Sequence, residues 1–431
     1  MLSIYRILTF FLYPLFVVLI YIRLIQKKED KLRYKEKIFA SCFNVSKNNE
    51  KKLIWFHAAS VGETLSILPL IEELNSFNKN IDFLITTVTL SSANLLKLRL
   101  NDFNNVTHRF FPFDTEYLSE RFLNAWKPNL VCFVDSEIWP NFLFKINKKK
   151  IPLVLINGRI TKKTFKKWNI FLNFAKKVFN NFNLCLPCSK ESMQNLRGLG
   201  VEKLSYIGNL KFTIKIKEEN LSMANVKILD TFKVWCAAST HEGEENIAIK
   251  THLEIKKNYK NILTIIIPRH IDRVSYIENL TIKFGLNYQI LSDGDAINNN
   301  NEILIINSFG VLFKYFKYCK NIFIGKSLIK KLSFDGGQDP IEAAKLNCKI
   351  YFGPYVYNFQ EVYDFLETNN MAEQIKNEYD LSKKIIKNFI DPAKIKNQNI
   401  DLLNNYGNKI LQQTAAELIK LLEINNENIQ T

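Results

Sequence analysis

From residue 52 onward, short apolar runs alternate with longer segments that have one polar and one apolar face. Apolar runs with few charges are typical of strands that are buried on both faces of a parallel sheet. The segments between them, such as Thr64–Phe77 and Ser91–Leu100, place apolar residues at helical spacing. We therefore predict strands at Leu53–His57, Ile81–Thr87, Leu130–Val134, Leu153–Asn157 and Leu184–Pro187, and then at Lys233–Ala238, Leu263–Pro268, Tyr288–Leu291, Ile303–Ile306, Asn321–Ile324 and Lys349–Phe352.

Two such series, separated by the more polar stretch Thr213–Ala224, predict an α/β protein with two doubly wound, Rossmann-like domains. We expect the first domain over residues 26–212 and the second over residues 213–431, including the helices near the C-terminus. Open sheets of this kind bind ligands at the carboxyl ends of their strands. We therefore expect the two domains to face each other across a cleft that is lined by these ends.

The N-terminal segment is apolar and is followed by a basic cluster. Residues 7–22 carry no charge, and together with the apolar residues before them they approach the ~20 residues that span a hydrocarbon core. The basic residues between Lys27 and Lys37 keep the downstream chain in the cytoplasm by the positive-inside rule. We expect a membrane anchor over residues 1–25, while Pro14, an interfacial placement and a buried core helix leave its geometry open.

The composition of the chain changes these predictions of fold and membrane anchoring little. The chain has 431 residues, is 47% hydrophobic and has a formal net charge of +17. A surplus of basic residues suits polyanionic partners, but a composition-biased genome that encodes many lysines would also produce it. The seven cysteines are scattered, which argues against a disulfide framework. We expect no nucleic-acid binding, because no recognition helix, aromatic RNA-binding signature or zinc module is visible.

In the first domain, candidate chemistry follows the predicted strands directly. Glu63 ends the segment His57-Ala-Ala-Ser-Val-Gly-Glu, where a carboxylate either stabilises a helix start through the helix dipole or serves as a general base. The segment Asp135-Ser-Glu-Ile-Trp-Pro-Asn141 places two carboxylates and a Trp at one strand end. Asn157-Gly-Arg159 ends the next strand, and Gly208-Asn-Leu-Lys211 closes the domain.

The second domain carries the features of a phosphate site. Arg269, just after the strand that ends at Pro268, can hold a phosphate through two hydrogen bonds. Asp339 as N-cap, with Pro340 at the first helical position, predicts a defined helix start behind Gly336 and Gly337. Glu342, one turn into that helix, could accept hydrogen bonds from a ribose. A capped structural helix or a surface Arg would give the same patterns, and the chain has no Walker A or GxGxxG motif.

Two domains, a nucleotide site in the second and an acidic group in the first describe a nucleotide-sugar transferase of the GT-B type. The chain also resembles the 3-deoxy-D-manno-octulosonic acid (Kdo) transferases of lipopolysaccharide biosynthesis, in ordered motifs along nearly its whole length. The motifs are HAASVGE, SEIWPN, NGR, GNLKF, STHEGEE, PRH, GGQDPIEAA and GPYVYNF. The resemblance implies transfer of Kdo from CMP-Kdo to the lipid A precursor lipid IVA, with inversion and without a metal or other cofactor. It also implies attachment to membrane lipid at the cytoplasmic face of the bacterial inner membrane.

The resemblance further implies roles for individual residues. Glu63 would be the general base, and Glu137 and Lys211 would provide the charges that stabilise the transition state. Residues of the second domain would bind the nucleotide sugar: Pro268, Arg269, Gly310, Val311, Leu312, Gly337, Asp339, Pro340, Ile341, Glu342 and Asn358.

The chain departs from the family pattern at several positions. Gln338 and Asp339 stand where His and Asn are usual, and the charge of Asp339 suits a nearby phosphate less well than an amide. Asp135 replaces a common Glu, Lys326 a common Gly, and Val311 a usual acidic residue. Three alternative functions remain: another GT-B lipid glycosyltransferase, a nucleotide-sugar epimerase, or a catalytically impaired membrane-bound homologue.

Overall fold

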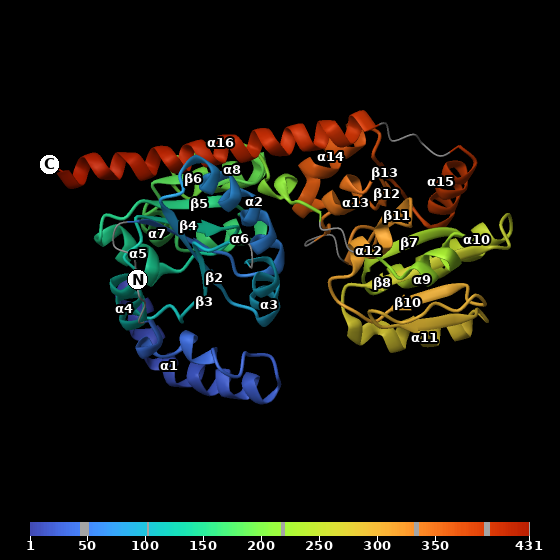
Figure 1. Ribbon diagram of the computed structural model, residues 1–431, viewed down its shortest axis with the longest axis horizontal. Helices are drawn as coiled ribbons and strands as arrows, with labels where there is room; N and C mark the ends of the chain where they lie inside the picture. Colours follow the sequence, from blue (N-terminus) through green and yellow to red (C-terminus); the bar gives the residue numbers. More distant parts are fainter. Residues whose placement is uncertain (44–50, 101–102, 217–219, 332–335, 392–396, 431) are drawn as a thin grey trace. The chain divides into compact units, whose positions relative to one another are not determined.

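The computed structural model describes residues 1–430 apart from residues 44–50, 101–102, 217–219, 332–335 and 392–396 (Figure 1). The chain divides into two compact units. The first unit comprises Met1–Ile214 together with Asn405–Thr431, and the second comprises Lys215–Asn404. Each unit is built around one parallel sheet.

The first unit holds a six-stranded sheet in the order β3-β2-β1-β4-β5-β6, which is the strand order of a dinucleotide-binding fold. Every strand pair in it is parallel. The strands are β1 Lys52–His57, β2 Ile81–Thr87, β3 Val106–Phe110, β4 Leu130–Val134, β5 Leu153–Gly158 and β6 Leu184–Pro187. The helices are α2 Val61–Phe77, α3 Leu90–Arg99, α4 Glu116–Trp126, α5 Pro140–Lys148, α6 Lys162–Asn169, α7 Leu172–Phe179 and α8 Lys190–Gly198.

The core of this unit is aromatic and centres on Trp55 of β1, whose side chain is fully buried. The Trp55 ring lies 4.9 Å from the Phe122 ring and 5.6 Å from the Phe133 ring, in tilted and edge-on arrangements that favour aromatic pairs. Ser and Thr residues cap the helices that follow the strands, because their hydroxyl oxygens accept otherwise unpaired backbone N–H groups. These caps are Ser60, Thr89, Thr115, Thr161 and Ser189.

The second unit holds a seven-stranded parallel sheet in the order β13-β12-β11-β7-β8-β10-β9. Its strands are β7 Lys233–Thr240, β8 Ile262–Pro268, β9 Tyr288–Leu291, β10 Ile303–Ile306, β11 Asn321–Ile324, β12 Lys349–Phe352 and β13 Ala372–Gln374. Its helices are α9 Met223–Leu229, α10 Glu244–Lys256, α11 Val274–Lys283, α12 Leu312–Phe316, α13 Ile341–Lys345, α14 Gln360–Thr368 and α15 Glu378–Ile390. The core lies between the sheet and α10, α11 and α15, and includes Trp235, Ile249 and Ile266.

Two helices lie outside this repeating pattern. The N-terminal helix α1 Leu2–Ile25 is long and apolar enough, by its length and composition, to cross a membrane. The C-terminal helix α16 Asn397–Gln430 begins in the second unit and continues into the first (Figure 1).

The predicted class, two doubly wound α/β domains with an N-terminal apolar helix, is confirmed. The expected strands are present, but β3 and β13 were missed. The β3 sequence Val-Thr-His-Arg-Phe lacks an apolar run because it forms the edge of its sheet, and β13 has only three residues.

The structure assigns residues 405–431 to the first unit, whereas the expected second domain ran to residue 431. The cause is local packing between α16 and the segment η4 Leu210–Thr213. The Tyr406 ring meets the Phe212 ring edge-on, with centroids 5.0 Å apart. Gly407 packs so closely that an added Cβ would lie 2.4 Å from the Phe212 carbonyl oxygen.

Candidate functional site

In each sheet the chain reverses the direction in which it adds strands, and the carboxyl edge at that switch point is where such folds bind ligands. In the first unit the switch point lies between β1 and β4, and in the second it lies between β7 and β11. Glu63 and Glu137 follow β1 and β4, and Lys326 follows β11. The residues that the sequence predicted therefore gather at the carboxyl edges of two separate sheets.

Glu63 lies half-buried in the first turn of α2. Its Oε2 accepts a hydrogen bond from the Ala59 backbone N–H at 2.7 Å, and its Oε1 accepts one from the Ser60 hydroxyl at 2.7 Å. The Ser60 oxygen in turn accepts from the Glu63 N–H, so the two residues form a reciprocal helix cap. Burial raises the pKa of Glu63, the charges of Asp135 and Glu137 raise it further, and the two hydrogen bonds oppose the shift.

Glu137 follows β4 and is fixed by two ring N–H groups. The Trp139 indole donates a hydrogen bond to Oε2 at 2.8 Å, and the buried imidazole of His57 lies 3.2 Å from the same oxygen. His57 is itself stacked on the Phe111 ring at 3.8 Å. Burial alone would raise the pKa of Glu137, but the hydrogen bonds from His57 and Trp139 and the His57 charge lower it. The group is therefore an ionised carboxylate at neutral pH.

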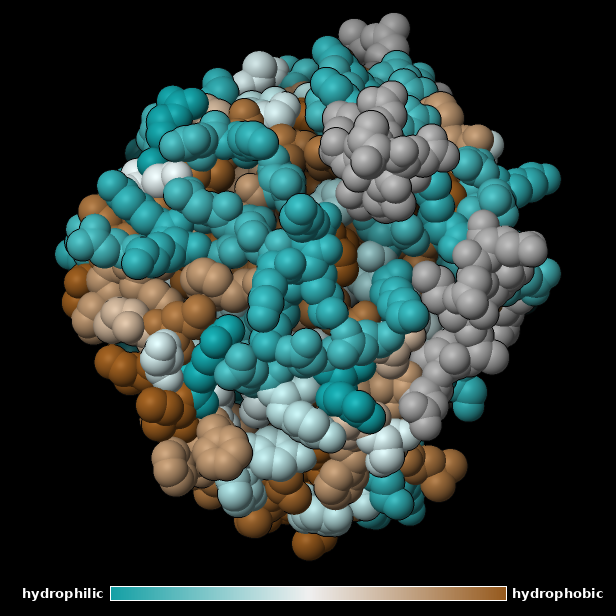
Figure 2. Space-filling view, turned by 90° about the vertical axis from the view of Figure 1, so that its left-hand side faces the viewer, coloured by the Kyte–Doolittle hydropathy of each residue, from teal (hydrophilic) through white to brown (hydrophobic). Residues whose placement is uncertain are grey.

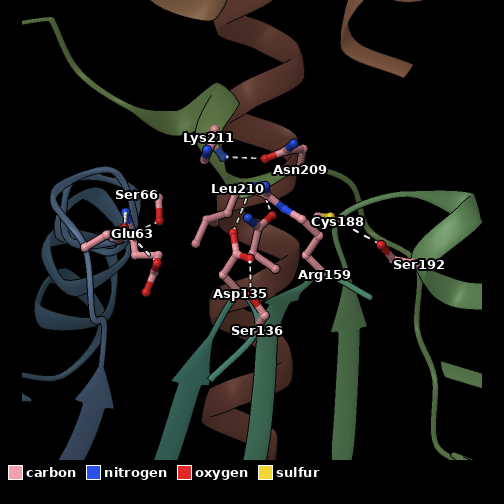
Figure 3. Close-up of polar contacts among 12 residues, drawn as sticks. Glu63, Ser66, Asp135, Ser136, Arg159, Cys188, Ser192, Asn209, Leu210 and Lys211 are labelled. Atoms are coloured by element: carbon pink, nitrogen blue, oxygen red, sulfur yellow. Dashed lines mark hydrogen bonds and ion pairs between the residues drawn. The ribbon is translucent and has the colours of Figure 1, made fainter. Parts of the chain in front are cut away.

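Asp135 adopts a left-handed backbone with φ of 61°, which turns the chain sharply at the end of β4. Its carboxylate is buried and accepts a hydrogen bond from the Arg159 guanidinium at 2.8 Å. Figure 3 shows this pair at the ends of β4 and β5, with Lys211 at the same edge and Glu63 on the neighbouring helix. The segment that carries Lys211 is held there because the Leu210 N–H donates to the Asn157 side-chain oxygen at 2.9 Å.

At the second switch point, cationic groups converge. Arg269 and His270 are exposed just after β8, and the Arg269 N–H donates to the Thr240 carbonyl oxygen at the end of β7. The His270 ring lies 5.8 Å from the His241 ring. Burial lowers the pKa of His241 to about 4, and the charges of Lys326, His270 and Arg269 act in the same direction. Arg269 and Lys326 give this edge a positive charge, which suits an anionic ligand.

The buried carboxylate of Glu244 organises this edge. It accepts backbone hydrogen bonds from His241 at 3.0 Å, Lys326 at 2.7 Å, Ser327 at 2.9 Å and Leu328 at 3.1 Å. Burial raises the pKa of Glu244, and the four backbone donors oppose that rise. The loop after β11 is thereby fixed to the start of α10, and only Gly fits at position 325, where a Cβ would lie 2.5 Å from the Ser239 carbonyl oxygen.

The Gly336–Glu342 segment lies against the same loop. The Gly337 N–H donates to the Lys326 carbonyl oxygen at 2.7 Å, and Gly337 has a φ of 95°. The Asp339 carboxylate accepts from the Ile341 N–H at 3.0 Å, as a cap does. The helix α13 begins at Ile341, however, with Pro340 as its flanking residue, so the predicted start at Pro340 was one residue too early.

The remaining predicted residues lie at the same carboxyl edge of the second sheet. Gly310, with φ of 76°, turns the chain after β10, and the short α12 begins at Leu312, directly after Val311. Asn358 is half-buried after β12, and its N–H donates to the Gly336 carbonyl oxygen at 3.1 Å.

Several residues with a place in these edges were not singled out from the sequence. His57, Arg159, His241 and Glu244 all stand inside the quoted motifs, but their roles depend on partners that are distant in the chain. The spacing of the motifs after strand ends was the one available signal. In the part of the chain that the structure describes, no group of three or more His, Cys, Asp or Glu side chains is arranged to hold a metal ion.

The pair of Rossmann-like units defines a protein of the GT-B fold type. A solved structure from Listeria monocytogenes, a putative UDP-N-acetylglucosamine 2-epimerase, superposes with a TM-score of 0.59 at 12% identity and covers 86% of this chain and 97% of that one. The UDP-GlcNAc 2-epimerase of Neisseria meningitidis gives a TM-score of 0.58 at 14% identity, covering 85% of this chain and 99% of that one. At these identities the likeness shows the fold alone.

Sequence relatives define the family more narrowly. A model of the family described as 3-deoxy-D-manno-octulosonic-acid transferase (kdotransferase) matches residues 32–214. A protein from Rickettsia bellii named 3-deoxy-D-manno-octulosonic acid transferase is 30% identical, covering 98% of this chain and 99% of that protein. A protein of the same name from Haemophilus influenzae is 25% identical over 86% of each chain. The chain belongs to the Kdo transferase family, a class of glycosyltransferases.

The contacts of Glu244 generate a stability prediction. In Glu244→Gln an amide replaces the carboxylate, so one oxygen and one NH2 group face four backbone N–H donors. The unpaired donors should destabilise the second unit by about 3 kcal/mol or more. Thermal unfolding followed by limited proteolysis within residues 215–404 would measure the loss. Glu242→Gln is the matched control, because Glu242 is exposed and pairs with the exposed Lys331. Equal melting curves for the two variants would contradict the role given to Glu244.

Proposed function

We propose that this chain transfers Kdo from CMP-Kdo to the lipid A precursor lipid IVA, within lipopolysaccharide biosynthesis. Family membership supports the class of reaction. The observation that carries the proposal is Glu63, a half-buried carboxylate with a raised pKa at the switch point of the first sheet. A base whose pKa lies nearer to neutrality than that of an ordinary Glu is better matched to abstracting a proton from a hydroxyl group.

In the proposed step, Glu63 takes the proton of an acceptor hydroxyl as the hydroxyl oxygen attacks the anomeric carbon of Kdo. The new bond joins the acceptor oxygen to that carbon. The bond between the carbon and the phosphate oxygen of CMP breaks, and its electron pair leaves with CMP. Attack on the face opposite the leaving group inverts the anomeric centre. CMP is a good leaving group, so the step needs no strong general acid, and we expect it to use no metal or other cofactor.

The neighbours of Glu63 suit the charges that develop in this step. Glu137 is kept ionised by His57 and Trp139 and would stabilise positive charge on the reacting sugar. Lys211 lies at the same edge and would balance the anionic carboxylate of Kdo. Both groups are positioned by backbone and ring contacts before substrate binds, which is the arrangement that makes electrostatic stabilisation effective.

The second unit would bind CMP-Kdo. Arg269 and Pro268 would contact the nucleotide phosphate and base, Gly310–Leu312 would form a second contact, and Gly337–Glu342 with Asn358 would cradle phosphate and ribose. The positive edge formed by Arg269 and Lys326 favours this assignment. The first unit would then bind the acceptor, with α1 associating the enzyme with the cytoplasmic face of the inner membrane.

Glu63→Gln tests the base directly. We expect turnover to fall by ~10²–10⁴-fold, because the amide cannot accept the proton. Binding of CMP-Kdo should be retained, since Glu63 belongs to the first unit. Initial rates of CMP release with lipid IVA, together with the mass of the product, would measure the effect and the number of sugars added.

Glu191→Gln is the matched control for this variant, because Glu191 also lies in the first turn of a helix that follows a strand of the same sheet. Its helix follows β6, at the far edge of the sheet from β1. Near-normal turnover in Glu63→Gln, with CMP-Kdo still bound, would remove Glu63 from the role of base.

The pH profile gives a second test. The Asp135 charge raises the pKa of Glu63, so Asp135→Asn should lower it, and the acid limb of kcat/KM should move to lower pH by up to about one unit. Asn tolerates the left-handed backbone at this position. Arg159→Gln leaves Asp135 uncompensated and should move the same limb to higher pH. Shifts in the same direction, or none in either variant, would contradict the proposed titration of Glu63.

A further inference from the structure

The N-terminal helix α1 contacts the first unit along most of its length. Near its start, the Tyr5 hydroxyl donates a hydrogen bond to the Asp114 carboxylate at 2.8 Å. In its middle, the Phe16 ring stacks on the Phe113 ring with centroids 4.6 Å apart. Toward its end, Ile20 is buried in a small cluster with partners from residues 34–38. Contacts at residues 5, 16 and 20 fall on one helical face, as do those of Thr9 and Tyr13.

The C-terminal end of α1 is tied down by charges. The Arg23 guanidinium contacts the Glu29 carboxylate at 2.6 Å, and the same carboxylate pairs with the Lys37 ammonium. The Lys37 ammonium also donates to the Val88 carbonyl oxygen at 2.8 Å. Glu29 and Lys37 are buried, so this network belongs to the packed body of the unit.

The opposite face of α1 is apolar and exposed over the whole helix. Phe11 is 73% exposed and Leu15 is 61% exposed. The exposed large apolar residues of the helix are Ile4, Ile7, Leu8, Phe10, Phe11, Leu15, Val18, Leu19, Tyr21, Ile22 and Ile25. In Figure 2 apolar residues gather along the lower part of the face in view, where Figure 1 places α1. An apolar surface of this extent on a water-soluble body marks a contact with lipid or another apolar partner.

These contacts are incompatible with α1 crossing a bilayer while it stays packed. The helix has 24 residues and is therefore about 36 Å long, comparable to a hydrocarbon core. If it stood upright, the body would stand beside it at the same depth. Asp114, Glu116 and the Glu29–Lys37 pair, which contact α1 or lie next to it, would then enter hydrocarbon, where each charge is strongly disfavoured.

The geometry points to α1 as an in-plane anchor that lies at the boundary between head groups and acyl chains and is rigidly attached to the first unit. Its occupant is a bilayer that contains anionic lipid. Lys27, Lys28, Lys31 and Lys35 are exposed just after the helix, where they can meet anionic head groups. Leu32, which is exposed among them, continues the apolar face.

The packing of α1 against the first unit has a consequence for the candidate site. This consequence rests on the proposed function. The partners of α1 follow β3 and β4, because they include Phe113 and Asn141, so the helix lies at the carboxyl edge of the first sheet. Glu63 and Glu137 lie at that same edge. A lipid acceptor whose sugars project from the bilayer would therefore reach Glu63 without leaving the membrane.

Labelling of the two ends of α1 tests its orientation without using the activity. In the full chain with Cys42→Ser, which removes the only cysteine that is not buried, single variants Ser3→Cys and Lys28→Cys place thiols at either end. Ser76→Cys, at the exposed end of α2, marks the side on which the body lies. A membrane-impermeant maleimide applied to intact membrane vesicles should label all three thiols from one side.

Protection of Ser3→Cys until detergent is added, with labelling of Lys28→Cys and Ser76→Cys, would show a spanning helix and overturn the inference.

Vesicle binding tests the apolar face itself. Phe11→Ser combined with Leu15→Ser should weaken partitioning into phosphatidylcholine–phosphatidylglycerol vesicles by at least about 100-fold. Phe77→Ser combined with Ile282→Ser, two exposed apolar residues on other helices, should not.

Unchanged vesicle binding in the α1 variant, or a dimer through this face with no vesicle binding by the native chain, would also overturn the inference. Transfer assays separate it from the proposed function. The α1 variant should lose transfer to lipid IVA held in vesicles and keep transfer to lipid IVA dispersed in detergent. If the native chain transfers no Kdo in detergent, the proposed function fails, whereas the labelling result still decides the orientation of α1.

Discussion

Carboxylates that accept backbone N–H groups at the first strand-to-helix turn organise both units. Glu63 follows β1 and Glu244 follows β7, which are the first strands of their sheets. A carboxylate offers about four acceptor sites. Glu244 is completely buried and uses them on four backbone donors, so it is a structural centre with no capacity left for a ligand. Glu63 is half-buried and accepts from one backbone N–H and one hydroxyl, which leaves lone pairs for an incoming hydroxyl.

From the sequence alone, Glu63 could be either a helix cap or a general base. Its contacts explain why both interpretations were open. The structure shows the cap directly, and the raised pKa arises from burial beside two other carboxylates. Capping fixes the position of the carboxylate, and burial tunes its basicity, so one role supports the other. The observed cap and the proposed role as base are therefore compatible.

Long apolar runs such as those of β1 and β8 could be predicted because burial on both faces leaves a continuous signal in the sequence. The edge strand β3 could not be predicted, because its sequence lacks an apolar run. The assignment of residues 405–431 could not be predicted either, because it depends on Tyr406 and Gly407 meeting Phe212, far away in the chain. For the candidate site, too, only the local features could be predicted from the sequence. Motifs at strand ends were visible, but three of the four groups that donate to Glu244 are backbone amides more than 80 residues away, which leave no trace in residue types.

Asp339 stands where the family usually has Asn, and its contacts show how the edge accommodates the additional negative charge. Part of its negative charge is met by the Ile341 N–H, and the Gly337 beside it is hydrogen-bonded to the carbonyl oxygen of Lys326. The cations Arg269 and Lys326 act together on His241, so the edge keeps a positive potential despite the added carboxylate. An anionic nucleotide therefore remains compatible with this edge.

Rigid attachment of α1 has a different consequence from attachment through a flexible linker. A flexible tether fixes only the local concentration of an enzyme at a surface and leaves its orientation free. Asn141 contacts Thr9 of α1 and follows Glu137 by four residues, so the anchor and the candidate site share one segment of the fold. The depth and orientation of the first sheet relative to lipid are then set by packing. Under the proposed in-plane anchoring, orienting Glu63 in advance would remove entropy that otherwise opposes the reaction, so such an anchor would contribute to turnover as well as to location.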